Sequence, residues 1–341
     1  MCISTPGNNM EGWTVERYEA AREREWNEFN SHSRNATFLT DRRYMDYHAD
    51  RFTDHSLIAR KNGKILALLP ADITADGVLH SHRGLTYGGW ILPPRHFDAA
   101  AMMTLWDVMT YYCRQSDIKG LDYKPLPHIF AAAPSGEDIY ALFRSGARLT
   151  ECQISAAIRL SDNPGFNQGR RQRLKKALAT GVIVEQATDE NAWRDFYCML
   201  QQCLADRHDA APVHSLDEML LLHSRFPANI QLWVARLDGE MLAGSVIYIS
   251  EKVVHSQYIA TSPEGRRLSM ISPLFDKLIQ LSAGGKFGTG VDYFDFGTSN
   301  EDHGLYLNES LYEQKASMGA TGVPYERYSV MFRKPNTVVM C

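Results

Sequence analysis

The chain has 341 residues, and this length predicts about two domains. Its 36 basic and 40 acidic residues give a formal net charge of −4, so no global positive field favours DNA, and any anion site has to be local. The sequence has no run of about 18 apolar residues and no secretory leader pattern, which predicts a cytoplasmic protein without a membrane span. The six cysteines have no C-x-x-C spacing, which favours reduced thiols over disulfides or zinc.

Two stretches of nearly the same sequence predict the same hairpin twice. ARKNGKILA occupies positions 59–67, and ARLDGEMLA occupies positions 235–243. Each stretch is typical of two strands joined by an Asx-Gly pair, because such pairs accept the positive φ of a tight hairpin turn. A single hairpin of this kind is common, so the flanking sequence decides whether the chain is duplicated.

The flanking sequence repeats in the same order. A His-Ser pair follows the first hairpin at position 80 and the second at position 255. Each half then has an amphipathic helix whose apolar face has the same spacing: Met102, Leu105, Trp106, Met109 and Cys113, and then Ile271, Leu274, Phe275, Leu278 and Ser282. GLDY at 120 and GVDY at 290 follow, each before a further helix and strand. The sequence therefore predicts two copies of one domain.

The joint between the copies carries a cluster of positive charge. Residues 161–182, SDNPGFNQGRRQRLKKALATGV, begin with turn-forming residues and continue as a helix that Gly181 closes. Its basic residues are Arg170, Arg171, Arg173, Lys175 and Lys176. Such a run is either a solvated helix face or a local phosphate site near a helix N-terminus. The predicted domains are residues 1–160 and residues 161–341, the second opening with this helix.

Two other motifs do not predict a site. GGKFGTG at 284–290 follows a helix and lacks the Ser or Thr that a P-loop has after its Lys, so we interpret it as a helix stop. His80 and His82 share a face of the predicted strand, but no carboxylate or thiol is spaced to complete a metal site. We therefore expect no metal.

The predicted order of elements resembles the GNAT acyltransferase fold, and two tandem copies resemble the FemAB-like aminoacyl and acyl transferases. The resemblance covers most of residues 20–332. It depends on YKPLPHIFAAAPSGEDIYALFR in the first copy and, in the second, on RRQRLKKALATGVIV, LWVARLDGEMLAGSVIYI, YFDFGTSN and LYEQKASMGA. It implies an α/β (α+β) fold class, with two tandem GNAT-like domains whose mixed sheets are flanked by helices. It also implies a transferase that forms an amide on an amine acceptor.

Amide formation needs a neutral amine, and this requirement indicates where a base is needed. A lysine-like amine with a pKa of about 10.4 is neutral in about one molecule per 2,500 at pH 7, so a base or desolvation has to supply roughly 4.6 kcal/mol. Strand alternation in VDYFDFGTS places Tyr293 and Asp295 on one face. We expect Asp295, His255 and Tyr258 to be catalytic and Tyr293 to contact the substrate. A carboxylate that caps the next loop is the alternative for Asp295.

The choice between possible donors depends on a motif that this sequence lacks. Acyl-CoA enzymes that the chain resembles have an Arg/Gln-x-x-Gly-x-Gly/Ala loop whose N–H groups bind pyrophosphate. The corresponding stretch, SPEGRRLSMISP at 262–273, keeps Arg266 and Arg267 as donor contacts but lacks the glycines. FemAB-like proteins also lack this loop, and those characterised use aminoacyl-tRNA to extend a peptidoglycan precursor. The resemblance therefore favours aminoacyl-tRNA over acyl-CoA, with tRNA phosphates on the basic helix and no permanently bound cofactor.

The same resemblance implies two contacts to the acceptor. Lys315, in YEQKASMG, matches a lysine that contacts an acceptor phosphate in the family, and an exposed helix lysine is the alternative. Arg207 fills one arginine position of the precursor-binding members, but Val213 and His214 stand where the second arginine is expected. The acceptor is therefore open between a cell-envelope precursor and another small-molecule or peptide-like amine.

Two further functions remain open. The first is a GNAT N-acetyltransferase that uses acyl-CoA. The second is a binding protein without turnover, in which the duplicated fold recognises an anionic ligand.

Overall fold

A computed structural model of the chain describes residues 10–208 and 211–332, apart from the side chains of residues 206–208. The chain divides into two compact units. The first unit contains the chain up to residue 152 together with residues from 325 onwards, and the second unit contains residues 153–324. No helix among the described residues is both long enough and apolar enough to cross a membrane.

The first unit combines a small antiparallel sheet with a second set of strands. Its strands are β1 (Trp13–Arg17), β2 (Leu57–Lys61), β3 (Lys64–Leu69), β4 (Asp72–Ile73), β5 (Val78–His80) and β6 (Gly120–Tyr123). Its helices are α1 (Glu23–Ser31), α2 (Arg42–Met45), α3 (Ala99–Gln115) and α4 (Glu137–Arg144). The strand orders are β1-β2-β3 and β4-β5-β6, and β6 pairs on its other side with the end of β15 (Thr321–Met331).

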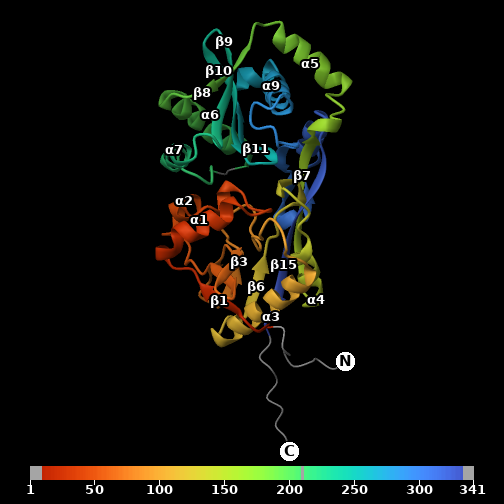
Figure 1. The fold of residues 1–341 in the computed structure, drawn as a ribbon. Coiled ribbons are helices and arrows are strands. Elements are labelled where there is room, and N and C mark those ends of the chain that lie inside the picture. The colour runs from red at the N-terminus through yellow and green to blue at the C-terminus, as the bar shows by residue number, and fades with distance from the viewer. Residues whose placement is uncertain (1–9, 209–210, 333–341) are drawn as a thin grey trace, which may run out of the picture. The chain divides into compact units, whose positions relative to one another are not determined.

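The second unit is a mixed sheet with helices on both faces. Its strands are β7 (Arg148–Arg159), β8 (Ile183–Ala187), β9 (Ile230–Leu237), β10 (Glu240–Ile249), β11 (Val253–Thr261), β12 (Tyr293–Thr298), β13 (Asn300–Glu301) and β14 (Tyr306–Leu307). Its helices are α5 (Gln168–Leu178), α6 (Glu190–His208), α7 (Leu216–Arg225), α8 (Pro263–Arg267), α9 (Ile271–Ala283) and α10 (Glu309–Ala316). The sheet order is β7-β12-β11-β10-β9-β8, and α9 and α6 lie on opposite sides of it (Figure 1).

Both predicted hairpins are confirmed. In the first, Asn62 and Gly63 have φ values of 51° and 79° and join β2 to β3. In the second, Asp238 and Gly239 have φ values of 50° and 83° and join β9 to β10. Two successive residues with positive φ give the turn the twist that antiparallel strands need. The repeated Asx-Gly pair thus forms the same turn in each unit.

The amphipathic helix predicted in each copy buries its apolar face on the sheet. The predicted face of α3, from Met102 to Cys113, is buried in the first core, and that of α9 is buried in the second. In the second core, the ring of Phe275 on α9 meets the rings of Phe294 and Phe296 edge to face, with centroids 5.9 and 5.0 Å apart. These contacts fix β12 against α9, because such aromatic pairs are favourable beyond their buried area.

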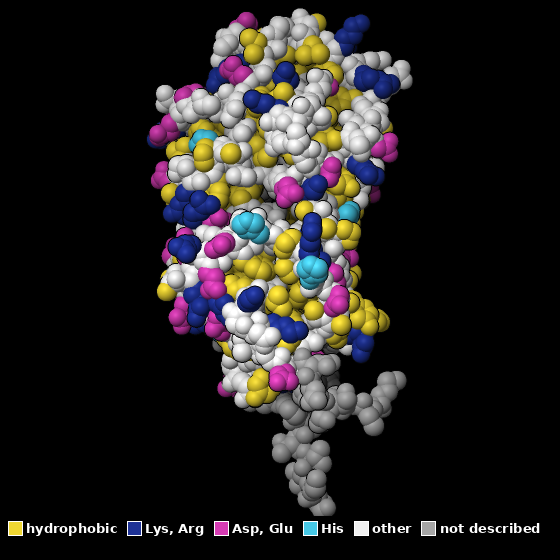
Figure 2. Space-filling view, viewed as in Figure 1, with side chains coloured by type: hydrophobic (Ala, Val, Ile, Leu, Met, Phe, Trp, Pro, Cys, Tyr) yellow, Lys and Arg dark blue, Asp and Glu magenta, His cyan; other side chains and the backbone are white. Residues whose placement is uncertain are grey.

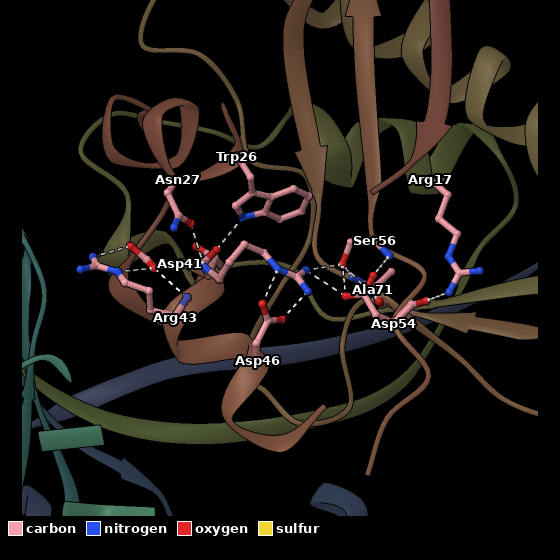
Figure 3. Close-up of polar contacts among 11 residues, drawn as sticks. Arg17, Trp26, Asn27, Asp41, Arg43, Asp46, Asp54, Ser56 and Ala71 are labelled. Atoms are coloured by element: carbon pink, nitrogen blue, oxygen red, sulfur yellow. Dashed lines mark hydrogen bonds and ion pairs between the residues drawn. The ribbon is translucent and has the colours of Figure 1, made fainter. Parts of the chain in front are cut away.

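A buried arginine organises the α2 region of the first unit. The guanidinium of Arg42 bonds the carboxylate of Asp54 at 2.9 Å and the hydroxyl of Ser56 at 3.1 Å, and it also pairs with Asp46 (Figure 3). The same guanidinium lies over the ring of Tyr18, 4.0 Å from its centroid. On the surface, side chains of opposite sign are interspersed over the visible face (Figure 2).

The last strand of each predicted copy lies in the other unit. The sequence places the strand after α4 in the first copy, but residues 155–159 of β7 pair with β12 in the second unit. Likewise, residues 328–331 of β15 pair with β6 in the first unit. The division therefore differs from the predicted domains 1–160 and 161–341. Sequence order could not reveal this, because each strand is compatible with either sheet edge.

The structure also corrects one equivalence between the copies. The parallel pairing of β5 with β6 sets His80 opposite Asp122, and that of β11 with β12 sets His255 opposite Asp295. GLDY therefore corresponds to the segment that begins at Tyr293, and its apparent match GVDY lies three residues too early. The misalignment has a physical cause, since residues 290–292 precede β12 and pair with neither strand ladder.

Candidate active site

A pocket opens in the second unit where two parallel strands separate. The pairing of β11 with β12 ends at His255 and Asp295. Beyond this point, Ile259 and Thr261 of β11 and Phe296 of β12 line a pocket of about 300 Å³. The pocket contacts α9 and also Cys203 of α6. Because Phe296 and Ile259 pack in the core that α9 covers, the pocket lies mainly on the α9 face of the sheet. In such a gap, a ligand can contact the backbone and the side chains of both strands.

Four positively charged side chains line this pocket: Arg170 and Arg173 of α5, Arg266 of α8 and Lys315 of α10. None of the described residues that line it is acidic. The remaining lining is largely apolar or uncharged: Cys203, Gly265, Ser269, Ile271, Phe275, Leu311, Gln314 and Met318. Positive charge in a partly apolar, concave site indicates an anionic ligand that also has an apolar or uncharged portion.

Arg170 is the most deeply buried of the charged residues of the basic helix. Asn167 caps α5 by accepting a hydrogen bond from the N–H of Arg170, which sets the helix start at the pocket. Only 6% of Arg170 is exposed, and its guanidinium donates to the hydroxyls of Ser317 and Ser272 and to the carbonyl of Gln314. Burial, followed by the nearby charge of Arg173, lowers the pKa of Arg170 to about 10. Its neutral partners leave its charge available to an anion.

Lys315 is buried rather than an exposed helix lysine. Only 4% of it is exposed, and its Nζ donates to the carbonyl oxygens of Gly297 at 2.8 Å and Thr298 at 2.6 Å. Burial lowers the pKa of Lys315 to about 8, although the charge of Asp295 opposes the shift. An ammonium group has three donors, so a third N–H remains for a ligand in the pocket.

The loop between β11 and α9 does not form a backbone cradle for pyrophosphate. The N–H of Gly265 donates to the hydroxyl of Ser262, and the N–H of Met270 donates to the carbonyl of Gly265. The N–H groups of Arg266, Leu268 and Ser269 also donate to oxygens of the same loop. Backbone N–H groups bind phosphate only when they are free to point at it. Side chains, rather than this loop, therefore supply the positive charge.

A His–Asp pair lies on the opposite face of the sheet from the pocket. Val254 and Phe294 face α9, so their neighbours His255 and Asp295 face away from it. Nδ1 of His255 lies 2.7 Å from Oδ2 of Asp295, and the hydroxyl of Ser155 donates to Oδ1 at 2.5 Å. Asp295 is fully buried, whereas His255 is partly exposed. The carboxylate accepts from Nδ1–H, so Nε2 carries the lone pair.

A β-bulge brings Tyr258 onto the same face as His255. β10 pairs Tyr248 with His255 and Val246 with Tyr258, so β11 has one extra residue between them. The hydroxyl of Tyr258 lies 2.5 Å from Nδ1 of His214. From the sequence, His214 was named only because it stands at a position where the resemblance implies an arginine. The bulge thus adds a second imidazole near the face where an acceptor amine would meet His255.

The remaining predicted site residues do not join these groups. Arg171, Lys175 and Lys176 are exposed and do not line the pocket, Arg267 pairs with Glu264, and Tyr293 starts β12 outside the pocket. Arg207 lies at the end of α6, and its side chain is outside the described part of the structure. The structure therefore brings together Arg170, Arg173, Arg266 and Lys315 on one face, and His255, Asp295 and Tyr258 on the other.

Comparison with known proteins identifies the architecture. Residues 166–304, most of the second unit, match the family model described as "Acetyltransferase (GNAT) domain". The crystal structure of FemX superposes with a TM-score of 0.65 at 12% identity, covering 93% of this chain and 97% of that chain. The chain has a tandem GNAT fold. The predicted resemblance and fold class are thereby confirmed at the level of the fold.

Two further solved structures are similar. L-PGS from Bacillus licheniformis superposes with a TM-score of 0.58 at 10% identity, covering 92% of each chain. A tandem GNAT protein from the clavulanic acid biosynthesis pathway, solved without AcCoA, superposes with a TM-score of 0.50 at 9% identity, covering 95% of this chain and 99% of that chain. No curated protein matches the sequence significantly. At these identities the likeness establishes the fold, and the activity has to be argued from the site.

Proposed function

We propose that this tandem GNAT protein is an N-acyltransferase that moves an acyl or aminoacyl group from an anionic carrier to an amine. The observation that carries the proposal is the gap between β11 and β12. On one face of the gap, Arg170 and Lys315 line a cationic pocket, and on the other His255 and Asp295 form a hydrogen-bonded pair. The carrier and the amine can therefore approach the same opening from opposite faces.

The carrier we favour is aminoacyl-tRNA. Its terminal phosphates suit guanidinium and ammonium groups, which bind phosphate through charge-assisted hydrogen bonds. The loop that would bind the pyrophosphate of acyl-CoA uses the N–H groups of Gly265, Arg266 and Met270 for its own bonds. This arrangement supports a donor that is held by side chains.

The proposed reaction moves one proton through His255. Nε2 of His255 accepts a proton from the acceptor amine, while Nδ1–H remains hydrogen-bonded to Asp295. The nitrogen lone pair attacks the carbonyl carbon of the donor, the C–N bond forms, and the bond to the carrier oxygen or sulfur breaks. The leaving atom takes up this proton from Nε2–H of His255, and the other proton that the ammonium form of the acceptor loses goes to solvent. The third N–H of Lys315 would bind an oxygen whose negative charge grows in the transition state.

Acyl-CoA is the second candidate donor. The family model that matches residues 166–304 is described as an acetyltransferase domain, which favours this donor class. The four basic side chains of the pocket would then bind the pyrophosphate that the loop does not hold. For the acceptor, we propose a peptide-like amine of a cell-envelope precursor that approaches from the His255 face.

Binding of labelled donors to matched variants tests the proposal. A fluorescent minihelix carrying a non-hydrolysable amide-linked amino acid is titrated against the full chain at low and moderate salt. Arg173→Ala changes a pocket residue, whereas Lys176→Ala removes an equal charge from the same helix outside the pocket. Acetyl-CoA is added as a competitor, and amide formation is then followed by mass spectrometry with lysine-containing peptides.

Each outcome decides between the functions. Minihelix binding that weakens with salt and with Arg173→Ala, but not with Lys176→Ala, supports aminoacyl-tRNA as the donor. Displacement by acetyl-CoA, with acetylated product, supports the second candidate. Tight binding of an anion without any product supports a binding protein instead. Binding of neither donor overturns the proposal.

A further inference from the structure

The first unit contains a second His–Asp pair in the same register as the pair in the second unit. Parallel pairing sets His80 opposite Asp122 in one unit and His255 opposite Asp295 in the other. Nδ1 of His80 lies 3.5 Å from Oδ2 of Asp122, against 2.7 Å for His255 and Asp295. The first pair faces away from α3 and the second faces away from α9, because their neighbours along the strands are buried in the α3 and α9 cores. The duplication has therefore kept the dyad, here meaning the histidine and the carboxylate, in two copies.

The next strand also contributes an equivalent position to each dyad. In the first unit, β15 sets Ser329 opposite Asp122, and Arg327 stands two residues earlier. In the second unit, β7 sets Ala157 opposite Asp295, and Ser155 stands two residues earlier. Because side chains alternate along a strand, Arg327 lies on the same face as Asp122, and Ser155 lies on the same face as Asp295.

Both of these residues bond the same carboxylate oxygen. Nε of Arg327 donates to Oδ1 of Asp122 at 2.6 Å, and Oγ of Ser155 donates to Oδ1 of Asp295 at 2.5 Å. The two sites therefore differ at one structurally equivalent position, which holds a guanidinium in the first unit and a hydroxyl in the second.

The two partners have opposite electrostatic consequences. Arg327 also bonds Glu151, so Asp122 belongs to a network of alternating charge. Burial raises the pKa of Asp122, but the hydrogen bonds from His80 and Arg327 outweigh it and the pKa is lowered overall. Part of the negative charge of Asp122 is thus neutralised by a permanent cation. A serine hydroxyl orients Asp295 without neutralising it, which leaves the full charge to stabilise an imidazolium at His255.

We propose that Ser155 is a positioning residue for the Asp295–His255 dyad, and that Arg327 holds the equivalent dyad of the first unit in a structural ion pair. The proposal rests on the transferase function proposed above and adds to it that each chain has one working dyad. The residue at one equivalent position, Arg327 in the first unit and Ser155 in the second, decides which dyad works. Ser155 acts through Asp295 and does not itself touch the reacting atoms.

The charged surroundings of the two dyads agree with this assignment. In the second unit, the groups around His255 are Asp295 from β12, Tyr248 opposite it on β10, and Lys315, which acts through Asp295. In the first unit, Asp122 adjoins His80, Arg327 and the buried Lys124, whose pKa burial lowers to about 8. Each dyad thus has a buried lysine nearby, and the first differs by the permanent charge of Arg327 on its carboxylate.

Nitrogen NMR of the histidine rings tests the proposal without depending on turnover. The full chain is labelled with ¹⁵N-histidine, and the ring signals of His255 and His80 are assigned with His255→Gln and His80→Gln variants. Wild type is expected to show His255 mainly as the Nδ1–H tautomer, held by Asp295. In Ser155→Ala this preference weakens and the tautomers mix, whereas Ser155→Thr, which keeps the hydroxyl, restores it.

Kinetics give the second readout. We expect Ser155→Ala to lower kcat about tenfold with little change in the KM of the donor, because the dyad and the pocket lie on opposite faces. Ser155→Thr should recover most of the loss. Arg327→Ser, checked for folding by its melting curve, should leave kcat unchanged, since the first dyad does not take part.

The outcomes separate this proposal from the proposed function. If no donor gives a product, the transferase assignment fails, but the tautomer measurement still reports on Ser155. An unchanged His255 tautomer in Ser155→Ala overturns the positioning role whatever the activity. A folded Arg327→Ser variant that loses as much kcat as Ser155→Ala overturns the assignment of the working dyad to the second unit.

Discussion

Arg170 and Lys315 place two almost fully buried positive charges on the wall of one pocket. Burial is the main reason why the pKa of each group is lowered, to about 10 and about 8. Buried charges without carboxylate partners are unfavourable until a counter-ion arrives. The pocket is therefore arranged to favour an anionic ligand at some cost to the stability of the empty protein.

The first prediction concerns anion-dependent stability. Inorganic pyrophosphate should raise the melting temperature, since a ligand at 100 times its Kd adds about 2.7 kcal/mol to the free energy of unfolding. Arg170→Met should lose most of this gain, because it removes a guanidinium from the pocket wall. Lys176→Met, which changes an exposed residue of the same helix, serves as the control in thermal melts. Equal gains in wild type and Arg170→Met would contradict a binding role for Arg170.

The second prediction concerns the dyad. Asp295→Asn should lower kcat by about 10² to 10⁴, because an amide can no longer fix the Nδ1–H tautomer that leaves Nε2 basic. His255→Gln should lose a similar amount. Steady-state kinetics should show little change in donor KM, since both residues face away from the pocket. Full activity in either folded variant would exclude His255 as the base.

The third prediction concerns alkaline pH. The lowered pKa of Lys315, about 8, means that its positive charge is lost as pH rises through 8, so kcat/KM should fall there. Because arginine keeps its charge to higher pH, Lys315→Arg should move this fall in kcat/KM to higher pH. Stability should follow the opposite trend, increasing from pH 8 towards 10.5, because the unfolded chain then holds a proton that the folded chain has lost. Parallel losses of activity and stability would indicate alkaline unfolding instead.

The fourth prediction concerns acid stability of the first unit. Burial, with the nearby charge of His48 as the next cause, lowers the pKa of His82 well below its ordinary value. As pH falls below about 6.5, the unfolded chain takes up a proton that the folded chain does not, and the free energy of unfolding decreases by at most about 1.4 kcal/mol per pH unit.

His82→Asn tests this, because asparagine tolerates the φ of 60° at this position. Urea titrations at pH 7 and pH 5 should show a smaller decrease for the variant than for wild type. Asp138, whose pKa burial raises to about 6, shifts stability in the other direction, but it is present in both proteins and cancels in the comparison. Equal pH dependence in both proteins would show that His82 is not the responsible group.

Local patterns predicted the hairpins and helices well. The Asx-Gly turns and the apolar faces of α3 and α9 depend on neighbouring residues, so the sequence alone was sufficient to place them. The strand ending at His80 was predicted too long, since His82 already has left-handed φ and does not share its face. Arg170, Arg173 and Arg266 were predicted to contact the donor and Lys315 the acceptor, and the structure places all four in the wall of one pocket.

Long-range relationships were not predictable from one sequence. Ser155 reaches Asp295 across 140 positions, and a serine in a strand carries no signal of such a partner. For Lys315, an exposed helix lysine was the alternative interpretation of the sequence. Its burial was not predictable, because the carbonyls that accept its hydrogen bonds become neighbours only when α10 packs on β12. The pairing of β7 with β12 and of β15 with β6 was also not predicted, because it joins segments more than 130 positions apart.

The pairing of β15 with β6 has a consequence for biosynthesis. When Tyr123 has left the ribosome, its partner Tyr328 is still untranslated, and at 5–20 residues per second it follows roughly 10 to 40 s later. Until then, β6 presents an open edge to other nascent chains. Completion of the first unit therefore has to wait until the second unit has been synthesised.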